Sequence, residues 1–242
     1  MSNEIETKIR NKVQEFYNTY IENNRNTPLP LEDNDDFRKF CGSEAYIPAT
    51  REGVIYLGST LANGSFFANA INATGGYGNI IQSNKEDLKI QVVEQLIAPF
   101  LEQKDFSKYK CLELMDLLFE RYYFRENNKY FTYGVCQKWV NMAIKYYLVG
   151  LSIISRTDIK VLIHSTGYCF FPIDSRMITA ITRDYGVMHY NNNDLKSPLP
   201  TPSPWTGCNL KYTFVEYWKF LLNKLNSEPT PIAPLIYEIL NW

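Results

Sequence analysis

Residues 131–146 read Phe-Thr-Tyr-Gly-Val-Cys-Gln-Lys-Trp-Val-Asn-Met-Ala-Ile-Lys-Tyr, and residues 171–185 read Phe-Pro-Ile-Asp-Ser-Arg-Met-Ile-Thr-Ala-Ile-Thr-Arg-Asp-Tyr. In both stretches apolar residues recur every three or four positions, which is the spacing of one face of an α-helix. We therefore expect helices over Thr132–Gly150 and Asp174–Tyr185, the second of them closed by Gly186. Lys138 lies near the start of the first helix, and Asp174 lies at the start of the second.

The same spacing recurs over most of the chain. It predicts further helices over residues 3–25, 37–41 (ended by Gly42), 84–102, 109–124, 210–225 and 232–240. Residues 43–84 are dense in Gly, Asn, Ser and Thr, so we expect an irregular insertion there, with a short strand at Val54–Leu57. Residues 159–164 fit either a strand or a packed loop. The sequence thus predicts a mostly α-helical fold with a small irregular or β-containing N-terminal portion, in a single domain of one or two lobes around a cleft.

Composition excludes several classes of protein. Hydrophobic residues make up 45% and aromatic residues 15% of the 242, which excludes a mainly disordered chain. The formal net charge is −1, so any nucleic-acid site must be a local basic patch. The five cysteines and two histidines lack zinc-ligand spacing, and no metal site is expected. With no signal peptide and no apolar run of about 18 residues, we expect a cytoplasmic protein with reduced thiols and no membrane partner.

The ionisable residues at the two helix starts, Lys138 and Asp174, allow a structural and a chemical interpretation. Asp is a preferred N-cap residue, because its carboxylate accepts the unpaired N–H groups of a first helical turn. In that interpretation Lys138 is an exposed helix lysine. A lysine and an aspartate that meet in a cleft can instead carry out nucleophilic chemistry. The chemical interpretation requires the amine and the carboxylate to face one cleft within several Å, with a basic rim.

The sequence around both residues resembles a known enzyme family. Residues 134–141, Gly-Val-Cys-Gln-Lys-Trp-Val-Asn, resemble the hairpin and second-helix start of the helix-hairpin-helix DNA glycosylases. Residues 172–185 resemble the stretch that follows in that family: Pro, a β-branched residue, Asp and then an apolar helix. The resemblance covers about residues 130–225 and is nearest to the 8-oxoguanine DNA glycosylases.

This resemblance implies a helix-hairpin-helix fold, DNA as the partner and no cofactor. It puts Lys138 in the place of the catalytic lysine, which attacks C1′ of an extruded nucleoside, and Asp174 in the place of the invariant aspartate. A helix start can also bind a DNA phosphate, and an indole can stack on a base. The expected substrate-binding residues are Gly134, Gln137, Trp139 and Arg176.

Two alternatives stay open beside a DNA glycosylase with lyase activity. The first is a non-enzymatic protein of the same fold that binds nucleic acid or a nucleotide. The second is a helical interaction protein in which Lys138 and Asp174 lie on surfaces. Within the glycosylase hypothesis, Lys145 is a rival nucleophile, because it follows Lys138 by seven residues and so faces nearly the same side of the helix.

Overall fold

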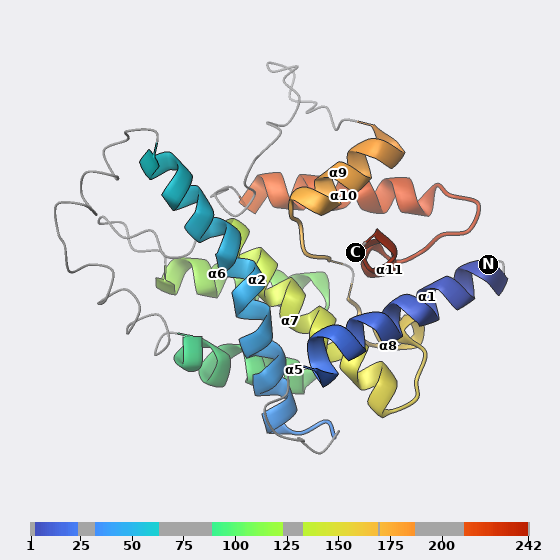
Figure 1. Ribbon diagram of the computed structural model, residues 1–242, viewed down its shortest axis with the longest axis horizontal. Coiled ribbons are helices and arrows are strands. Elements are labelled where there is room, and N and C mark those ends of the chain that lie inside the picture. The colour runs from blue at the N-terminus through green and yellow to red at the C-terminus, as the bar shows by residue number, and fades with distance from the viewer. Residues whose placement is uncertain are drawn as a thin grey trace.

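The computed structural model describes residues 3–23, 32–62, 89–122, 133–168, 170–186 and 211–241. Every regular element within these residues is a helix (Figure 1). The elements are α1 (Asn3–Phe16), the π-helix η1 (Tyr17–Glu22), α2 (Asp35–Ala62), the π-helix η2 (Val93–Ile97), α5 (Ala98–Gln103), α6 (Lys108–Tyr122), α7 (Tyr133–Ile154), α8 (Ile159–Thr166), α9 (Ser175–Tyr185), α10 (Lys211–Asn226) and α11 (Pro234–Asn241). The predicted mostly α-helical class is therefore confirmed.

α7 is the central helix of the molecule. It packs against α1, α2, α6, α8 and α10, and Figure 1 shows it running through the middle with α2 crossing it. Every residue from Tyr133 to Gly150 is buried, as expected of a helix that is apolar on all sides. Lys138 and Lys145 therefore point into the protein, and the interpretation of Lys138 as an exposed helix lysine is wrong.

The N-terminal portion is helical where it was expected to be irregular. α2 continues through Gly42 and through the predicted strand at Val54–Leu57, and ends at Ala62. A Cβ atom at Gly42 would lie 3.1 Å from Ile97 Cγ2 on η2, so this glycine permits close helix packing, which overrides its low helix propensity. The predicted insertion is therefore wrong for residues 43–62, and residues 63–88 lie outside the described part of the chain.

A second glycine was also misread as a helix end. α7 continues past Gly150 to Ile154. A Cβ atom at Gly150 would lie 2.3 Å from Cζ of Phe37 on α2, which is far inside van der Waals contact. The Phe37 ring of α2 thus occupies the space that a side chain at position 150 would need, which explains why glycine is required there.

We expect Gly150→Ala to lower the free energy of unfolding by about 1–3 kcal/mol, the usual cost of overpacking a core. The ring of Phe37 is buried, and it lies 6.0 Å from the Tyr147 ring, so its room to move aside is limited. Chemical denaturation of the wild type, Gly150→Ala, Phe37→Leu and the double variant measures the effect. The shorter side chain at position 37 should recover part of the loss, and strictly additive losses would contradict the steric explanation.

Residues 159–164 belong to a helix, α8, rather than to a strand or a packed loop. The Asp158 carboxylate accepts a hydrogen bond of 2.8 Å from the Lys160 backbone N–H. Gly167 ends the helix with a φ of 68°, a left-handed conformation that glycine adopts readily. The local capping signals were present in the sequence, but eight residues are too few for periodicity alone to separate a helix from a strand.

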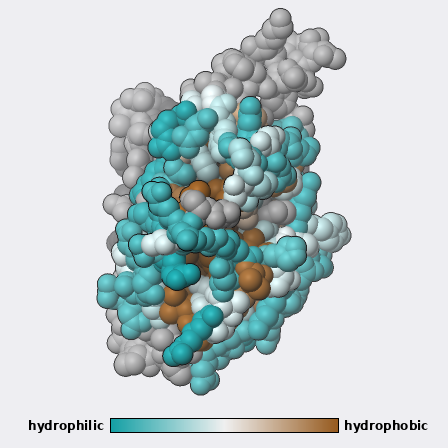
Figure 2. Space-filling view, turned by 90° about the vertical axis from the view of Figure 1, so that its right-hand side faces the viewer, coloured by the Kyte–Doolittle hydropathy of each residue, from teal (hydrophilic) through white to brown (hydrophobic). Residues whose placement is uncertain are grey.

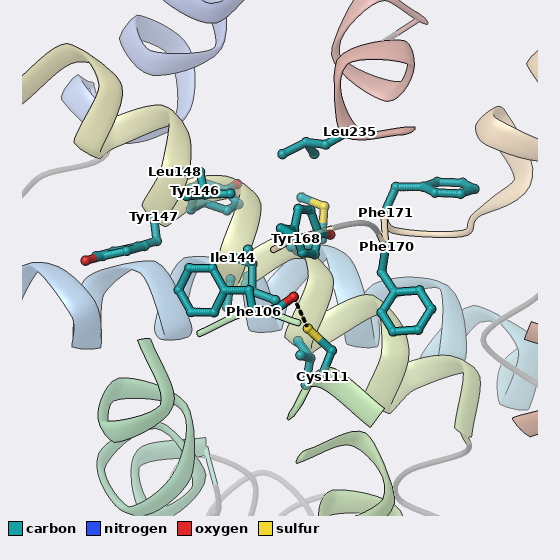
Figure 3. Packing of buried hydrophobic residues seen from close by; sticks show 14 of the residues in the cluster. Phe106, Cys111, Ile144, Tyr146, Tyr147, Leu148, Tyr168, Phe170, Phe171 and Leu235 are labelled. Carbon is teal, nitrogen blue, oxygen red and sulfur yellow. Dashed lines mark hydrogen bonds between the residues drawn. The ribbon is translucent and has the colours of Figure 1, made fainter. Parts of the chain in front are cut away.

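Aromatic side chains fill much of the core (Figure 3). In that view the Cys111 thiol donates a hydrogen bond of 3.2 Å to the Phe106 carbonyl. Cys41, Cys111 and Cys136 are free and buried, and burial raises the pKa of the Cys41 and Cys136 thiols well above the ordinary range. The expectation of buried, unpaired thiols is confirmed for these three cysteines, and the other two lie outside the described residues.

The surface is mainly hydrophilic on the face shown in Figure 2, where hydrophobic residues (brown) form small areas among hydrophilic ones (teal). None of the described helices is both long and apolar enough to cross a membrane. Within the same described ranges, no three His, Cys, Asp or Glu side chains are grouped so that they could hold a metal ion.

Candidate functional site

Lys138 and Asp174 meet inside the protein. Lys138 is in the second turn of α7, Asp174 directly precedes α9, and the Lys138 Nζ lies 3.5 Å from the Asp174 Oδ2. The two side chains are only 4% and 6% exposed. The pair therefore has the separation that the chemical interpretation requires, but it is enclosed instead of facing an open cleft.

The Asp174 carboxylate divides its two oxygens between the helix and the lysine. Oδ1 accepts a hydrogen bond of 3.0 Å from the Met177 backbone N–H, which is the N-cap interaction predicted from the sequence. Oδ2 is the oxygen that faces Lys138. Because the cap fixes the orientation of the carboxylate, the charge opposite Lys138 is held in one place while the backbone N–H groups of α9 help to solvate it.

Gln137 on α7 forms hydrogen bonds to the segment that precedes α9. Its Nε2 donates to the Ile173 carbonyl at 2.8 Å, and its Oε1 accepts from the Ile173 backbone N–H at 3.2 Å. Asn141 donates to the same Oε1 at 3.4 Å and accepts from the Tyr168 hydroxyl at 3.1 Å. Gln137 was predicted to bind substrate. In the structure its side-chain amide hydrogen-bonds to the backbone of Ile173, the residue before Asp174.

We expect Gln137→Met to lower the free energy of unfolding by about 2–4 kcal/mol, because two buried backbone groups of Ile173 would each lose a partner. Methionine preserves the volume and the apolar contacts, so the loss reports hydrogen bonding rather than a cavity. Urea denaturation measures the change. Asn141→Leu, which removes a more peripheral member of the same network, is expected to cost less, and the reverse order would contradict the anchoring role.

The other three predicted substrate-binding residues lie in different environments. Gly134 is the second residue of α7 and is buried. Trp139 is also buried, donates a hydrogen bond of 2.8 Å to the Gly42 carbonyl and packs edge-on against the Tyr46 ring, so it joins α7 to α2. Arg176 lies in the first turn of α9 and is exposed. Of the three, only Arg176 presents its side chain to the surface.

A second buried lysine–carboxylate pair lies further along α7. The Lys145 Nζ is 2.7 Å from Glu238 Oε1 on α11, and both side chains are 0% exposed. The same Nζ lies 4.3 Å from the centroid of the Phe16 ring, within cation–π range. Among the described residues, Glu238 Oε2 has no hydrogen-bond partner. We call Lys138, Asp174, Lys145 and Glu238 together the α7 charge cluster.

Burial and charge set the protonation of this second pair. Burial, with a smaller contribution from the positive charge of Arg176, lowers the pKa of Lys145 to about 8, and Glu238 opposes this lowering. Burial raises the pKa of the Glu238 carboxyl, and Lys145 opposes that rise. Asp174 also acts on both groups, so the two pairs share one electrostatic environment.

Lys145 was predicted from the sequence as an alternative nucleophile to Lys138, but its partner Glu238 was not predicted. One signal was available: Glu238 is the single charged residue in the apolar helix Pro234–Asn241. A lone charge on such a helix, in a chain with a buried lysine elsewhere, suggests a buried partner. The pairing itself could not be predicted, because it joins residues that are 93 positions apart in the sequence.

A pocket lies next to the charge cluster. Its volume is about 220 Å³, and its lining residues are Lys12, Glu15, Phe16, Thr19, Tyr20, Arg176 and Ile239. One of them, Phe16, also contacts Lys145 of the cluster, and another, Ile239, is the residue after Glu238 in α11. Neither Lys138 nor Asp174 lines this pocket. The open space and the predicted catalytic pair are therefore neighbours rather than one site.

Comparisons of this chain with protein-family models, with curated proteins and with solved structures found no significant match. The feature with the most specific chemistry is the α7 charge cluster, which holds two lysine amines beside two carboxylates in the interior of the protein.

Proposed function

We propose that this protein is a DNA glycosylase with lyase activity, in which Lys138 is the nucleophile and Asp174 the partner carboxylate. One observation carries the proposal: segments that are distant in the sequence bring the Lys138 Nζ to 3.5 Å from Asp174 Oδ2, in an enclosed position. The capping of α9 by Asp174 adds support, because it holds the carboxylate in a fixed orientation. The type of reaction is proposed from the resemblance of residues 130–225 to helix-hairpin-helix glycosylases.

The proposed reaction begins when Lys138 gives its proton to a neighbouring base, for which Asp174 is positioned. The neutral amine attacks C1′ of an extruded nucleoside, the bond from C1′ to the base breaks, and the base leaves with the bonding electrons and takes up a proton. That proton comes from Asp174, whose carboxylate is then negative again and stabilises the positive charge on the sugar. When the sugar ring opens, the C1′–O4′ bond breaks, O4′ takes up a proton from the attached amine, and a Schiff base remains between Lys138 and C1′.

The burial of the pair adds a requirement. Because the two side chains are 4% and 6% exposed, a nucleoside reaches them only after neighbouring side chains move. Closure of these side chains around the bound nucleoside would then exclude water from the amine, which strengthens the electrostatic effect of the carboxylate. Substrate binding is therefore expected to be slow relative to diffusion and to be accompanied by a conformational change.

Borohydride trapping tests the proposal. The full chain is incubated with oligonucleotides that each carry one damaged base, and borohydride reduces any Schiff base to a stable secondary amine that joins protein and DNA. A covalent adduct on at least one lesion is expected, with release of the free base. No adduct on any lesion, at protein concentrations that saturate DNA binding, would remove the lysine mechanism.

A second candidate is a nucleic-acid- or nucleotide-binding protein of the same fold without chemistry. The enclosed position of both ion pairs favours it, since a buried lysine–carboxylate pair also serves to fix the packing of helices. This candidate predicts salt-sensitive DNA affinity with no base release and no trapped adduct. The trapping experiment, paired with a DNA-binding measurement at two salt concentrations, separates the two.

A further inference from the structure

The pocket between α1, η1, α9 and α11 has a composition that suits a ligand of one particular kind. Its lining combines two cationic side chains, one carboxylate, one threonine hydroxyl and two aromatic rings. We propose that this pocket binds a small molecule with a single aromatic ring and one anionic group, a phosphate or a carboxylate. This inference does not depend on the proposed glycosylase activity.

The anionic group is assigned to the Arg176 side of the pocket. Arg176 is exposed in the first turn of α9, and a guanidinium binds phosphate or carboxylate oxygens through two parallel hydrogen bonds. The other cation, Lys12, forms an ion pair of 2.9 Å with Glu15. The pocket lining thus contains two cationic side chains and one carboxylate, so an anionic group suits it better than a cationic one.

The ring is assigned to the opposite wall. The Phe16 and Tyr20 rings lie 4.9 Å apart, centroid to centroid, and both line the pocket beside Ile239. An aromatic ligand can stack against or meet the edges of these rings, an interaction that adds to simple apolar burial. The volume of about 220 Å³ is below the range of drug-sized ligand sites, so it limits the ligand to about one ring.

The position of the pocket links its occupancy to the α7 charge cluster. The Lys145 Nζ lies 4.3 Å from the centroid of the Phe16 ring, which lines the pocket. The Arg176 charge helps to lower the pKa of Lys145, in addition to the larger effect of burial. An anion bound to Arg176 would offset that charge and raise the pKa of Lys145. The pKa of Lys145 should therefore show whether the pocket is occupied, although the ligand does not touch this amine.

Calorimetric titration of the full chain with phenyl phosphate, benzoate and inorganic phosphate tests the proposal. Phenyl phosphate or benzoate is expected to bind at least ten times more tightly than inorganic phosphate, and the stronger of the two identifies the anionic group. Arg176→Gln should weaken that binding about tenfold or more. The matched control is Arg10→Gln, because Arg10 is exposed on α1 and does not line the pocket. Equal effects of the two substitutions, or equal affinity for inorganic phosphate, would overturn the assignment.

Two further measurements keep the test independent of folding defects. Tyr20→Leu changes a half-buried wall residue and should reduce the preference for the aromatic ligand over inorganic phosphate, whereas an unchanged preference contradicts the ring site. The NMR titration of Lys145 should shift to higher pH when the preferred ligand saturates the protein. Ligand binding is measured on the wild-type chain without DNA, so failure of borohydride trapping and failure of this proposal are separate outcomes.

Discussion

Lys138→Gln is expected to abolish the borohydride-trapped adduct, because glutamine has no amine to form a Schiff base. The side chain is buried, and glutamine preserves most of its length and can still hydrogen-bond to Asp174, so the fold should survive the change. Gel analysis of the protein–DNA adduct measures the result over time. Lys224→Gln, at an exposed position on α10, is the control and should trap as the wild type does.

The carboxylate can be tested separately from its capping role. Asn caps helices about as well as Asp, so Asp174→Asn should leave α9 intact while removing the charge opposite Lys138. We expect trapping to slow by about a hundredfold or more, in line with the loss of an electrostatic or acid–base group. Asp158→Asn is a matched control, because Asp158 caps α8 in the same way and lies on the surface.

The outcome that contradicts this assignment is equally specific. If Lys138→Gln retains the adduct and a variant at Lys145 loses it, the nucleophile is Lys145 and Glu238 replaces Asp174 as the partner carboxylate. If Asp174→Asn and Asp158→Asn slow trapping to the same small extent, Asp174 acts through helix capping alone. Thermal unfolding of each variant separates either result from a loss of fold.

Local signals in the sequence located α9 and its cap. Asp174 before the first turn and Gly186 after the last residue mark its two ends, and both features depend only on neighbouring residues. α10 and α11 likewise followed from helical periodicity, and their bounds agree within a few residues. The Lys138–Asp174 pairing is a different case, because it was expected from a family resemblance and not from the residues alone.

The errors arose where tertiary packing overrides a local preference. Gly42 and Gly150 were interpreted as helix ends, yet both lie inside helices at points where a Cβ atom would meet a neighbouring helix. A glycine at a close helix contact and a glycine at a helix end look the same in one sequence. The bonds of Gln137 to Ile173 were also not foreseen, because they depend on how α7 packs against the segment before α9.

Glu238→Leu is expected to lower the free energy of unfolding by about 3–5 kcal/mol at pH 7, because it leaves the Lys145 charge buried without its carboxylate. Replacing both partners, as Lys145→Met with Glu238→Leu, removes the two charges together. The double variant should be close to the wild type or more stable, because an apolar pair of similar volume has no charge to desolvate. Urea denaturation of the wild type, both single variants and the double variant measures this cycle.

The pH dependence gives the cycle a second, independent readout. Burial lowers the pKa of Lys145 in the folded state to about 8, below its unfolded value, so between these values the unfolded chain binds more protons and the contribution of Lys145 to stability rises with pH. Glu238 raises the pKa of Lys145, so Glu238→Leu lowers that pKa further. Lys145 then loses its proton nearer to neutral pH. The cost of Glu238→Leu should therefore shrink between pH 7 and pH 9.5. A cost that stays constant over this range would mean that the loss comes from altered packing around α11 and not from an uncompensated charge.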